Sequence, residues 1–422
     1  MTARITTRIT TLDNGLRVVT DPMASVESAT LGVWVGVGTR DEAPEVNGVA
    51  HLLEHMAFKG TRRRSALAIA QEIEAVGGYL NAYTSRENTA YYARVLKEDT
   101  GLALDILADI LQHSVFDAEE LSRERAVVLQ EIGQANDTPD DIIFDHFQET
   151  AFPDQPLGRP VLGSAEIVRN LSRDAVAGYL GAHYGGPRMV LTAAGAVDHD
   201  RLVAQAAEAF RDLPAVAPVG PQAARYAGGD FRRNRDLEQL HLIVGFDGVG
   251  YHDPDFYAES VLSTLLGGGM SSRLFQEIRE KRGLVYSIYS FSSFYVDGGI
   301  FGIYAGTGEE DVTELLPVLC DEIVKVAEDA TEEEVSRARA QMKASLLMGL
   351  ESTMARAEQV AQQMLIYGQP QGLDEIVAKI DAVDVEAVRR VARRLRNGPP
   401  TIAALGPTGR LESHDSIRSR LA

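Results

Sequence analysis

The chain has 422 residues, of which 45% are hydrophobic and 24% are charged. This length favours two domains, and the balance of apolar and charged residues is typical of a globular protein. The net charge of −20 argues against a nucleic-acid-binding surface, because phosphate backbones select basic proteins. The acidity is compatible with attraction of basic peptides if it lines a cavity, and equally with a surface that only keeps the protein in solution.

Targeting and membrane signals are missing from the sequence pattern. No run approaches the ~18 consecutive apolar residues that indicate a membrane span. The N-terminal segment leads into an alternating stretch at residues 9–20 and lacks the apolar core of a signal peptide. Cys320 is the single cysteine, which excludes an intrachain disulfide and favours a reducing compartment. We therefore expect a cytoplasmic protein with neither nucleic-acid nor membrane partners.

The first half of the chain mixes strand-like and helix-like segments. Alternating hydrophobicity predicts strands at residues 16–20, 29–36, 90–95 and 189–194. Helical periodicity predicts helices at residues 49–58, 66–76, 100–112, 118–135 and 174–183. The pattern then dissolves into prolines and glycines, which predict an interdomain linker at residues 213–229.

The second half repeats features of the first. Gln71-Glu72-Ile73 recurs 205 residues later as Gln276-Glu277-Ile278, and in both copies a helix ends near a glycine before an aromatic-rich strand. The shared order at this offset predicts an internal duplication. Strands and helices without a regular βαβ rhythm favour two homologous α+β domains, each a mostly antiparallel sheet with helices packed on one side. The expected domains are residues 1–212 and 230–422.

The pentapeptide His51-Leu52-Leu53-Glu54-His55 is the strongest chemical signal in the first half. A helix turns about 100° per residue, so His51 and His55 project within roughly 40° of each other and can grip one metal ion. Glu54 lies close enough to serve as a general base for water at the metal. The order reverses the commoner His-Glu-x-x-His zinc motif. The alternative is a histidine pair that merely decorates a helix.

A hydrolytic zinc site needs a third protein ligand. The predicted helix at 118–135 carries several carboxylates, and Glu124 and Glu131 lie seven residues apart on one face. One of them could bind the metal while the other orients a histidine. Spacing alone does not choose between these roles, and a solvated acidic helix remains the alternative.

The chain resembles the pitrilysin (insulysin-type) peptidases, especially the half-sized subfamily of the mitochondrial processing peptidase. The resemblance covers nearly the whole chain and rests on the segments 51–61, 80–87 and 124–131. It implies that Glu131, 76 positions after His55, is the third zinc ligand and that Glu124 supports the site.

The resemblance also implies a zinc-dependent endopeptidase with one zinc ion per chain and Glu54 as the general base for a metal-activated water. Unstructured peptides would bind as an added edge strand along the segment 80–84 inside a closed chamber. Asn81 and Ala82 would position the peptide backbone. Peptides commonly bind by extending a sheet edge in this way. An ordinary core strand is the alternative for this segment.

The second half lacks the metal motif around residues 256–260 but contains Arg279 and, seven residues later, Tyr286. The resemblance implies that this pair holds the substrate backbone and stabilises the tetrahedral oxyanion. In a half-sized chain the pair would act on a partner's zinc site, so we expect a homodimer with two composite active sites. The alternatives are a catalytic subunit that needs an unlike partner and a non-catalytic scaffold of the same fold.

Overall fold

The computed structural model describes residues 7–216, 220 and 222–422, and the chain divides into two compact units. Each unit contains one sheet with helices packed against it, so the prediction of two α+β domains is confirmed. The units are not contiguous in sequence. The first comprises Met1–Gly133, Arg159–Pro221 and Gly349–Gln371, and the second comprises Gln134–Gly158, Gln222–Met348 and Gly372–Ala422.

The first unit is built on a six-stranded sheet with the order β1-β2-β6-β3-β5-β4. All neighbouring strands are antiparallel except the pair β2–β6. The strands are β1 (Arg8–Thr11), β2 (Arg17–Pro22), β3 (Ser28–Val35), β4 (Tyr79–Thr84), β5 (Thr89–Leu96) and β6 (Met189–Gly195). The helices are α1 (Val49–Ala57), α2 (Ala66–Ala75), α3 (Thr100–Gln112), α4 (Ala118–Asp137), α6 (Ala165–Asn170), α7 (Arg173–His183), α8 (His199–Ala209) and α12 (Thr353–Tyr367).

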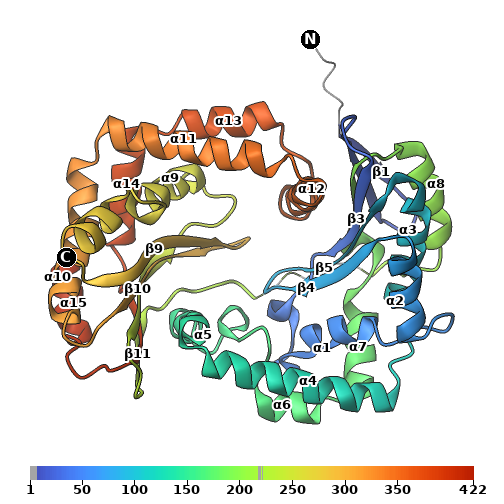
Figure 1. The fold of residues 1–422 in the computed structure, drawn as a ribbon, viewed down its shortest axis with the longest axis horizontal. Coiled ribbons are helices and arrows are strands. Elements are labelled where there is room, and N and C mark those ends of the chain that lie inside the picture. The colour runs from blue at the N-terminus through green and yellow to red at the C-terminus, as the bar shows by residue number, and fades with distance from the viewer. Residues whose placement is uncertain (1–6, 217–219, 221) are drawn as a thin grey trace. The chain divides into compact units, whose positions relative to one another are not determined.

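Alternate residues of the central strands face two different helical layers. On β3, Leu31 and Val33 join the core that contains α1, α3 and α8, whereas Trp34 packs with residues of α12. Because successive strand residues point to opposite faces, α12 covers the face opposite the other helices, as Figure 1 shows. Helices on one side were predicted, and α12 adds a layer on the other.

The second unit repeats this plan with a five-stranded sheet of order β7-β11-β8-β10-β9. Its strands are β7 (Gly229–Asn234), β8 (Leu240–Gly248), β9 (Val285–Phe294), β10 (Gly299–Thr307) and β11 (Thr401–Gly406). Its helices are α5 (Pro139–Ala151), α9 (Phe256–Gly267), α10 (Val312–Asp329), α11 (Glu332–Gly349), α13 (Leu373–Asp381), α14 (Val385–Leu395) and α15 (His414–Leu421), and Phe275–Glu280 forms a π-helix. The pair β7–β11 is parallel, as β2–β6 is in the first unit. The shared strand order therefore agrees with the duplication inferred from the offset of 205 residues.

The two halves of the sequence exchange one helix each. Helix α5, from the first half, packs Ile143 and Phe147 against Ile243 and Ala403 of the second sheet. Helix α12, from the second half, packs on the first sheet. These exchanged segments are the main difference between the observed units and the expected domains 1–212 and 230–422.

The expected linker at 213–229 is partly described. Leu213 is buried in the core of the first unit, and Tyr226 packs in the second. Residues 217–219 and 221 lie outside the described residues. Within the described chain, none of the helices has the length and hydropathy needed to cross a bilayer.

Candidate metal centre

The N-terminus of α1 is held by a buried carboxylate. Gly48, the N-cap, has φ of +98°, a conformation that suits glycine. Glu42 accepts hydrogen bonds from the backbone N–H groups of Gly48 (2.9 Å) and Ala50 (2.8 Å) and from the side chain of Asn47 (2.7 Å). Burial raises the pKa of Glu42 to about 7. This residue fixes the start of the motif helix, and sequence analysis missed it because two of its three partners are backbone groups.

Helix α1 places both motif histidines opposite α4. The rings of His51 and His55 have centroids 4.7 Å apart. The Nε2 atoms lie 3.7 Å (His51) and 3.6 Å (His55) from Glu131 Oε2. Each of the three residues offers one ligand atom, and these three atoms all lie within 4.8 Å of one another. Two imidazoles and one carboxylate are a donor set that suits zinc.

The geometry gives Glu124 and Glu131 different positions relative to the histidines, a distinction that sequence spacing could not make. Glu124 Oε2 lies 2.9 Å from Nδ1 of His55, on the ring edge that faces away from Glu131. Its other oxygen, Oε1, lies 2.7 Å from the ammonium of Lys59. Glu131 therefore faces the shared space between the histidines, and Glu124 occupies the position of a supporting carboxylate. Lys59 was not singled out from the sequence.

Burial favours the neutral form of His51, the first histidine of the motif. Loss of solvation, with a smaller contribution from the neighbouring His55, lowers the pKa of His51 to about 4. Among the described residues, Nδ1 of His51 is buried and has no hydrogen-bond partner. A neutral imidazole with its Nε2 atom directed at Glu131 has the protonation state that metal binding requires.

Glu54 is oriented by the neighbouring strand. The hydroxyl of Thr84, the last residue of β4, donates to Glu54 Oε2 at 2.6 Å. Burial raises the pKa of Glu54, and the hydrogen bond from Thr84 opposes this shift. A carboxyl group with a raised pKa is better matched to proton transfer near neutral pH. Thr84 belongs to the segment that carries the family resemblance, although no role was assigned to it.

Strand β4 is an edge strand of the first sheet as far as the described residues go, because its one neighbour in the strand order is β5. Asn81 and Ala82 lie in its middle, and the backbone N–H of Ala82 donates to the side-chain oxygen of Asn81 at 2.8 Å. This N–H is thus bonded to the side chain of the preceding residue. The edge offers backbone groups to an added strand.

Arg279 and Tyr286 are neighbours in the second unit. The Arg279 guanidinium lies 4.9 Å from the ring centroid of Phe275 and 5.6 Å from that of Tyr286. The register between β9 and β10 skips Tyr286, since Gly306 pairs with Ser287 and Thr307 pairs with Val285. This bulge accounts for the exposure of the Tyr286 side chain, which is 76%. Arg279 lies on the π-helix, another local irregularity that is frequent at functional sites.

The second unit has no counterpart of the metal motif. At the offset of 205 residues, Phe256 and Ser260 occupy the histidine positions, whereas Glu259 corresponds to Glu54 and is also a glutamate. Glu259 is fully buried and accepts a hydrogen bond from the backbone N–H of Val249 at 3.0 Å. The glutamate that faces Thr84 in one repeat is thus a buried structural group in the other.

Solved structures share this fold. A protease from Helicobacter pylori aligns with a TM-score of 0.87 and 23% identity, covering 95% of this chain and 99% of that one. A peptidase M16 inactive domain from Pseudomonas fluorescens aligns with a TM-score of 0.88 and 21% identity, covering 96% and 98%. These likenesses extend over both units.

Sequence relatives are closer. An uncharacterized zinc protease of Streptomyces coelicolor is 44% identical, covering 95% of this chain and 90% of its own length. A probable mitochondrial-processing peptidase subunit beta of Arabidopsis thaliana is 40% identical, covering 98% and 81%. The family model described as insulinase (peptidase family M16) matches residues 17–165, and the model described as peptidase M16 inactive domain matches residues 170–342. The chain therefore belongs to the insulinase family, peptidase family M16, as one of its half-sized members.

Proposed function

We propose that the protein is a zinc-dependent endopeptidase that binds one zinc ion per chain through His51, His55 and Glu131. The observation that carries the proposal is the convergence of these three ligand atoms within 4.8 Å of one another. Glu54 lies next to the pair of histidines on α1 and is oriented by Thr84. The names of relatives in Streptomyces and Rickettsia, which are called zinc proteases, support the same reading.

Glu54 is the proposed general base. A bound zinc ion would lower the pKa of a water molecule at the site and polarise the scissile carbonyl. Glu54 would accept the proton of the attacking water and later donate it to the leaving amine. The Thr84 hydroxyl holds one carboxylate oxygen, so the carboxyl group keeps a fixed direction while its proton moves.

The proposed substrate is an unstructured peptide that extends the first sheet at β4. Asn81 and Ala82 would present backbone groups to this added strand. The Ala82 N–H is bonded to the Asn81 side chain. A bound peptide would take over this donor and release the Asn81 amide to the substrate. Folded proteins would be excluded, because a closed chamber and a sheet edge demand an extended chain.

Arg279 and Tyr286 are proposed to bind the substrate backbone and the developing oxyanion. Two fixed donors aimed at that charge are an effective way to lower the barrier. We propose that they serve the zinc site of a second copy in a cytoplasmic homodimer. The Arabidopsis relative is named as a beta subunit, which favours an unlike partner as the second candidate.

Zinc content and chelator sensitivity test the proposed activity. We expect the purified chain to bind zinc with a stoichiometry of one and to cleave a library of unstructured peptides. A strong chelator should stop cleavage, and added zinc should restore it. Mass spectrometry of the peptides measures the cleavage. A chain that binds zinc but cleaves no peptide, alone or as a dimer, would support the scaffold alternative.

A mixture of two inactive variants tests the composite site. Glu54→Gln and Arg279→Ala should each be strongly impaired alone. If the sites are shared between copies, a hybrid dimer contains one site with both residues intact. Random exchange should then restore about a quarter of the wild-type rate. Subunit exchange is verified by native mass spectrometry with a tagged copy. Exchange without recovery would rule out action in trans.

A further inference from the structure

The loop after α1 brings one cation to the supporting carboxylate of the metal centre. Lys59 Nζ lies 2.7 Å from Glu124 Oε1, and Glu124 Oε2 lies 2.9 Å from His55 Nδ1. The exposed fractions of the Lys59 and Glu124 side chains are 30% and 7%. One carboxylate is thus gripped from both sides, by a proposed metal ligand and by a lysine.

Because Glu124 is buried, its pairing with Lys59 has a larger effect than a pair at the surface would have. A buried carboxylate that loses one of its charged partners is costly, because part of its charge is left uncompensated. If Oε1 lost its partner, only the bond to His55 would hold the carboxylate, and its orientation would be less fixed. The hydrogen bond to Nδ1 fixes both the ring orientation and the tautomer of a metal-binding histidine. The Lys59 ammonium therefore helps to determine the direction of the His55 ring.

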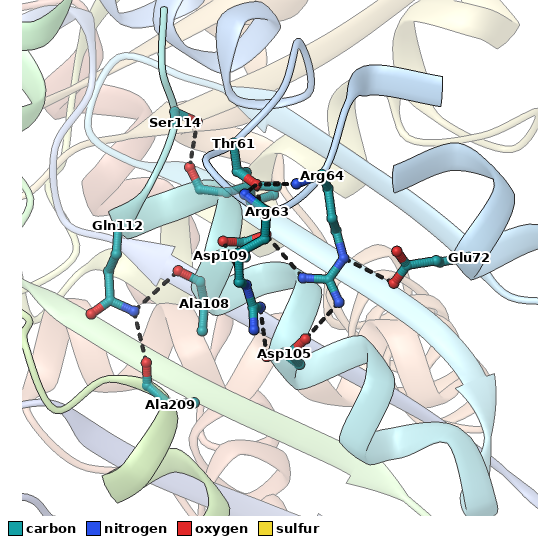
Figure 2. Close-up of polar contacts among 11 residues, drawn as sticks. Thr61, Arg63, Arg64, Glu72, Asp105, Ala108, Asp109, Gln112, Ser114 and Ala209 are labelled. Atoms are coloured by element: carbon teal, nitrogen blue, oxygen red, sulfur yellow. Dashed lines mark hydrogen bonds and ion pairs between the residues drawn. The ribbon is translucent and has the colours of Figure 1, made fainter. Parts of the chain in front are cut away.

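The loop that carries Lys59 is anchored by a polar cluster. Figure 2 shows the Arg64 guanidinium between Glu72 of α2 and Asp105 and Asp109 of α3, and the Thr61 hydroxyl at Asp109. Arg64 donates to Asp109 at 2.9 Å and to Asp105 at 2.6 Å. The Asp109 side chain is fully buried. The loop is thereby tied to the middle and C-terminal part of α3.

Backbone contacts hold the same loop at two further points. The N–H of Val115 donates to the carbonyl of Gly60 at 3.2 Å, and the N–H of Arg62 donates to the carbonyl of His113 at 3.1 Å. These bonds start directly after Lys59 in sequence. The Cα of Lys59 is therefore fixed relative to α1 and α3, which limits the positions that its side chain can reach.

The geometry points to Lys59 as a positioning residue of the metal centre, acting through Glu124 on His55. This inference rests on the proposed zinc site and adds a residue to it. Most lysine–carboxylate pairs at a protein surface contribute little to the free energy of folding. The pair of Lys97 with Glu27, whose side chains are 54% and 77% exposed, is such a pair in the same unit. Lys59 differs because its partner is buried and bonded to a proposed ligand.

Zinc affinity, measured by competition with a chromophoric chelator, tests the inference. We expect Lys59→Met to bind zinc about 10-fold more weakly than the wild type, as for loss of a group that orients a ligand. Lys59→Arg should recover most of the affinity, because a guanidinium can reach the same carboxylate. Lys97→Met, the matched control, should bind zinc like the wild type. Melting of the metal-free variants checks that each is folded, and Lys59→Gln replaces Lys59→Met if the latter is not.

A double-mutant cycle tests the route through Glu124. In a Glu124→Gln background, Lys59→Met should have little further effect on zinc affinity, since the link to His55 is already broken. An undiminished effect there, or wild-type affinity in Lys59→Met, would overturn the inference while the zinc site stands. Failure of the wild type to bind zinc would instead remove the proposed function itself.

Discussion

Replacing Glu54 with Gln is expected to reduce peptide cleavage by about 10³-fold while zinc stays bound. Glutamine keeps the size of the side chain, and its carbonyl oxygen can still accept the hydrogen bond from Thr84, 2.6 Å away in the native protein. The amide cannot accept the proton of the attacking water. Steady-state cleavage of a fluorogenic peptide, with zinc content measured on the same sample, provides the test.

Glu74→Gln is the matched control for this variant. Glu74 is an exposed glutamate on α2 of the same unit, and its replacement should leave both activity and zinc content unchanged. If Glu54→Gln lost its zinc together with its activity, the residue would belong to the metal site and not act as the base. Retention of activity would exclude Glu54 from the chemistry.

The second large effect is expected for zinc affinity in Glu131→Gln. Glu131 Oε2 lies 3.7 and 3.6 Å from the Nε2 atoms of His51 and His55, where a shared metal ion would contact all three. An amide is a much weaker zinc ligand than a carboxylate, so affinity should fall further than in Glu124→Gln. That variant loses the charge that pairs with His55 and Lys59 but no proposed ligand, and it should weaken binding roughly 10- to 100-fold. Competition titration with a chelator ranks the two variants.

Glu119→Gln controls for the removal of a negative charge from α4. Its side chain is 77% exposed and pairs with Arg123 at the surface, so zinc affinity should not change. If Glu124→Gln instead bound zinc more weakly than Glu131→Gln, the two carboxylates would exchange roles when metal binds.

Local sequence patterns predicted the elements that carry the site. The helix predicted at 100–112 has the same bounds in the structure, and those predicted at 49–58 and 118–135 differ from α1 and α4 by one or two residues at their ends. The duplication was also visible, because both halves retain the same order of helix, glycine and strand. Such patterns depend on residues within a few turns of each other.

Contacts between distant segments could not be predicted in the same way. Spacing put Glu124 and Glu131 on one face of α4, but their different distances from the two edges of the His55 ring follow from the packing of α4 against α1. Glu42, Lys59 and Thr84 each reach the site from a loop or strand end whose pattern carries no signal of its partner.

The sequence by itself determined the α+β class, the repeat and the pentapeptide His51–His55 that we propose binds the metal. The tertiary structure decided which sheet each exchanged helix covers, and which carboxylate faces the shared space between His51 and His55. It also decided that the bulge at Tyr286 exposes that side chain beside Arg279. The reason is physical. Helical and strand periodicity is set by neighbouring residues, whereas the orientation of a ligand depends on groups brought together by packing.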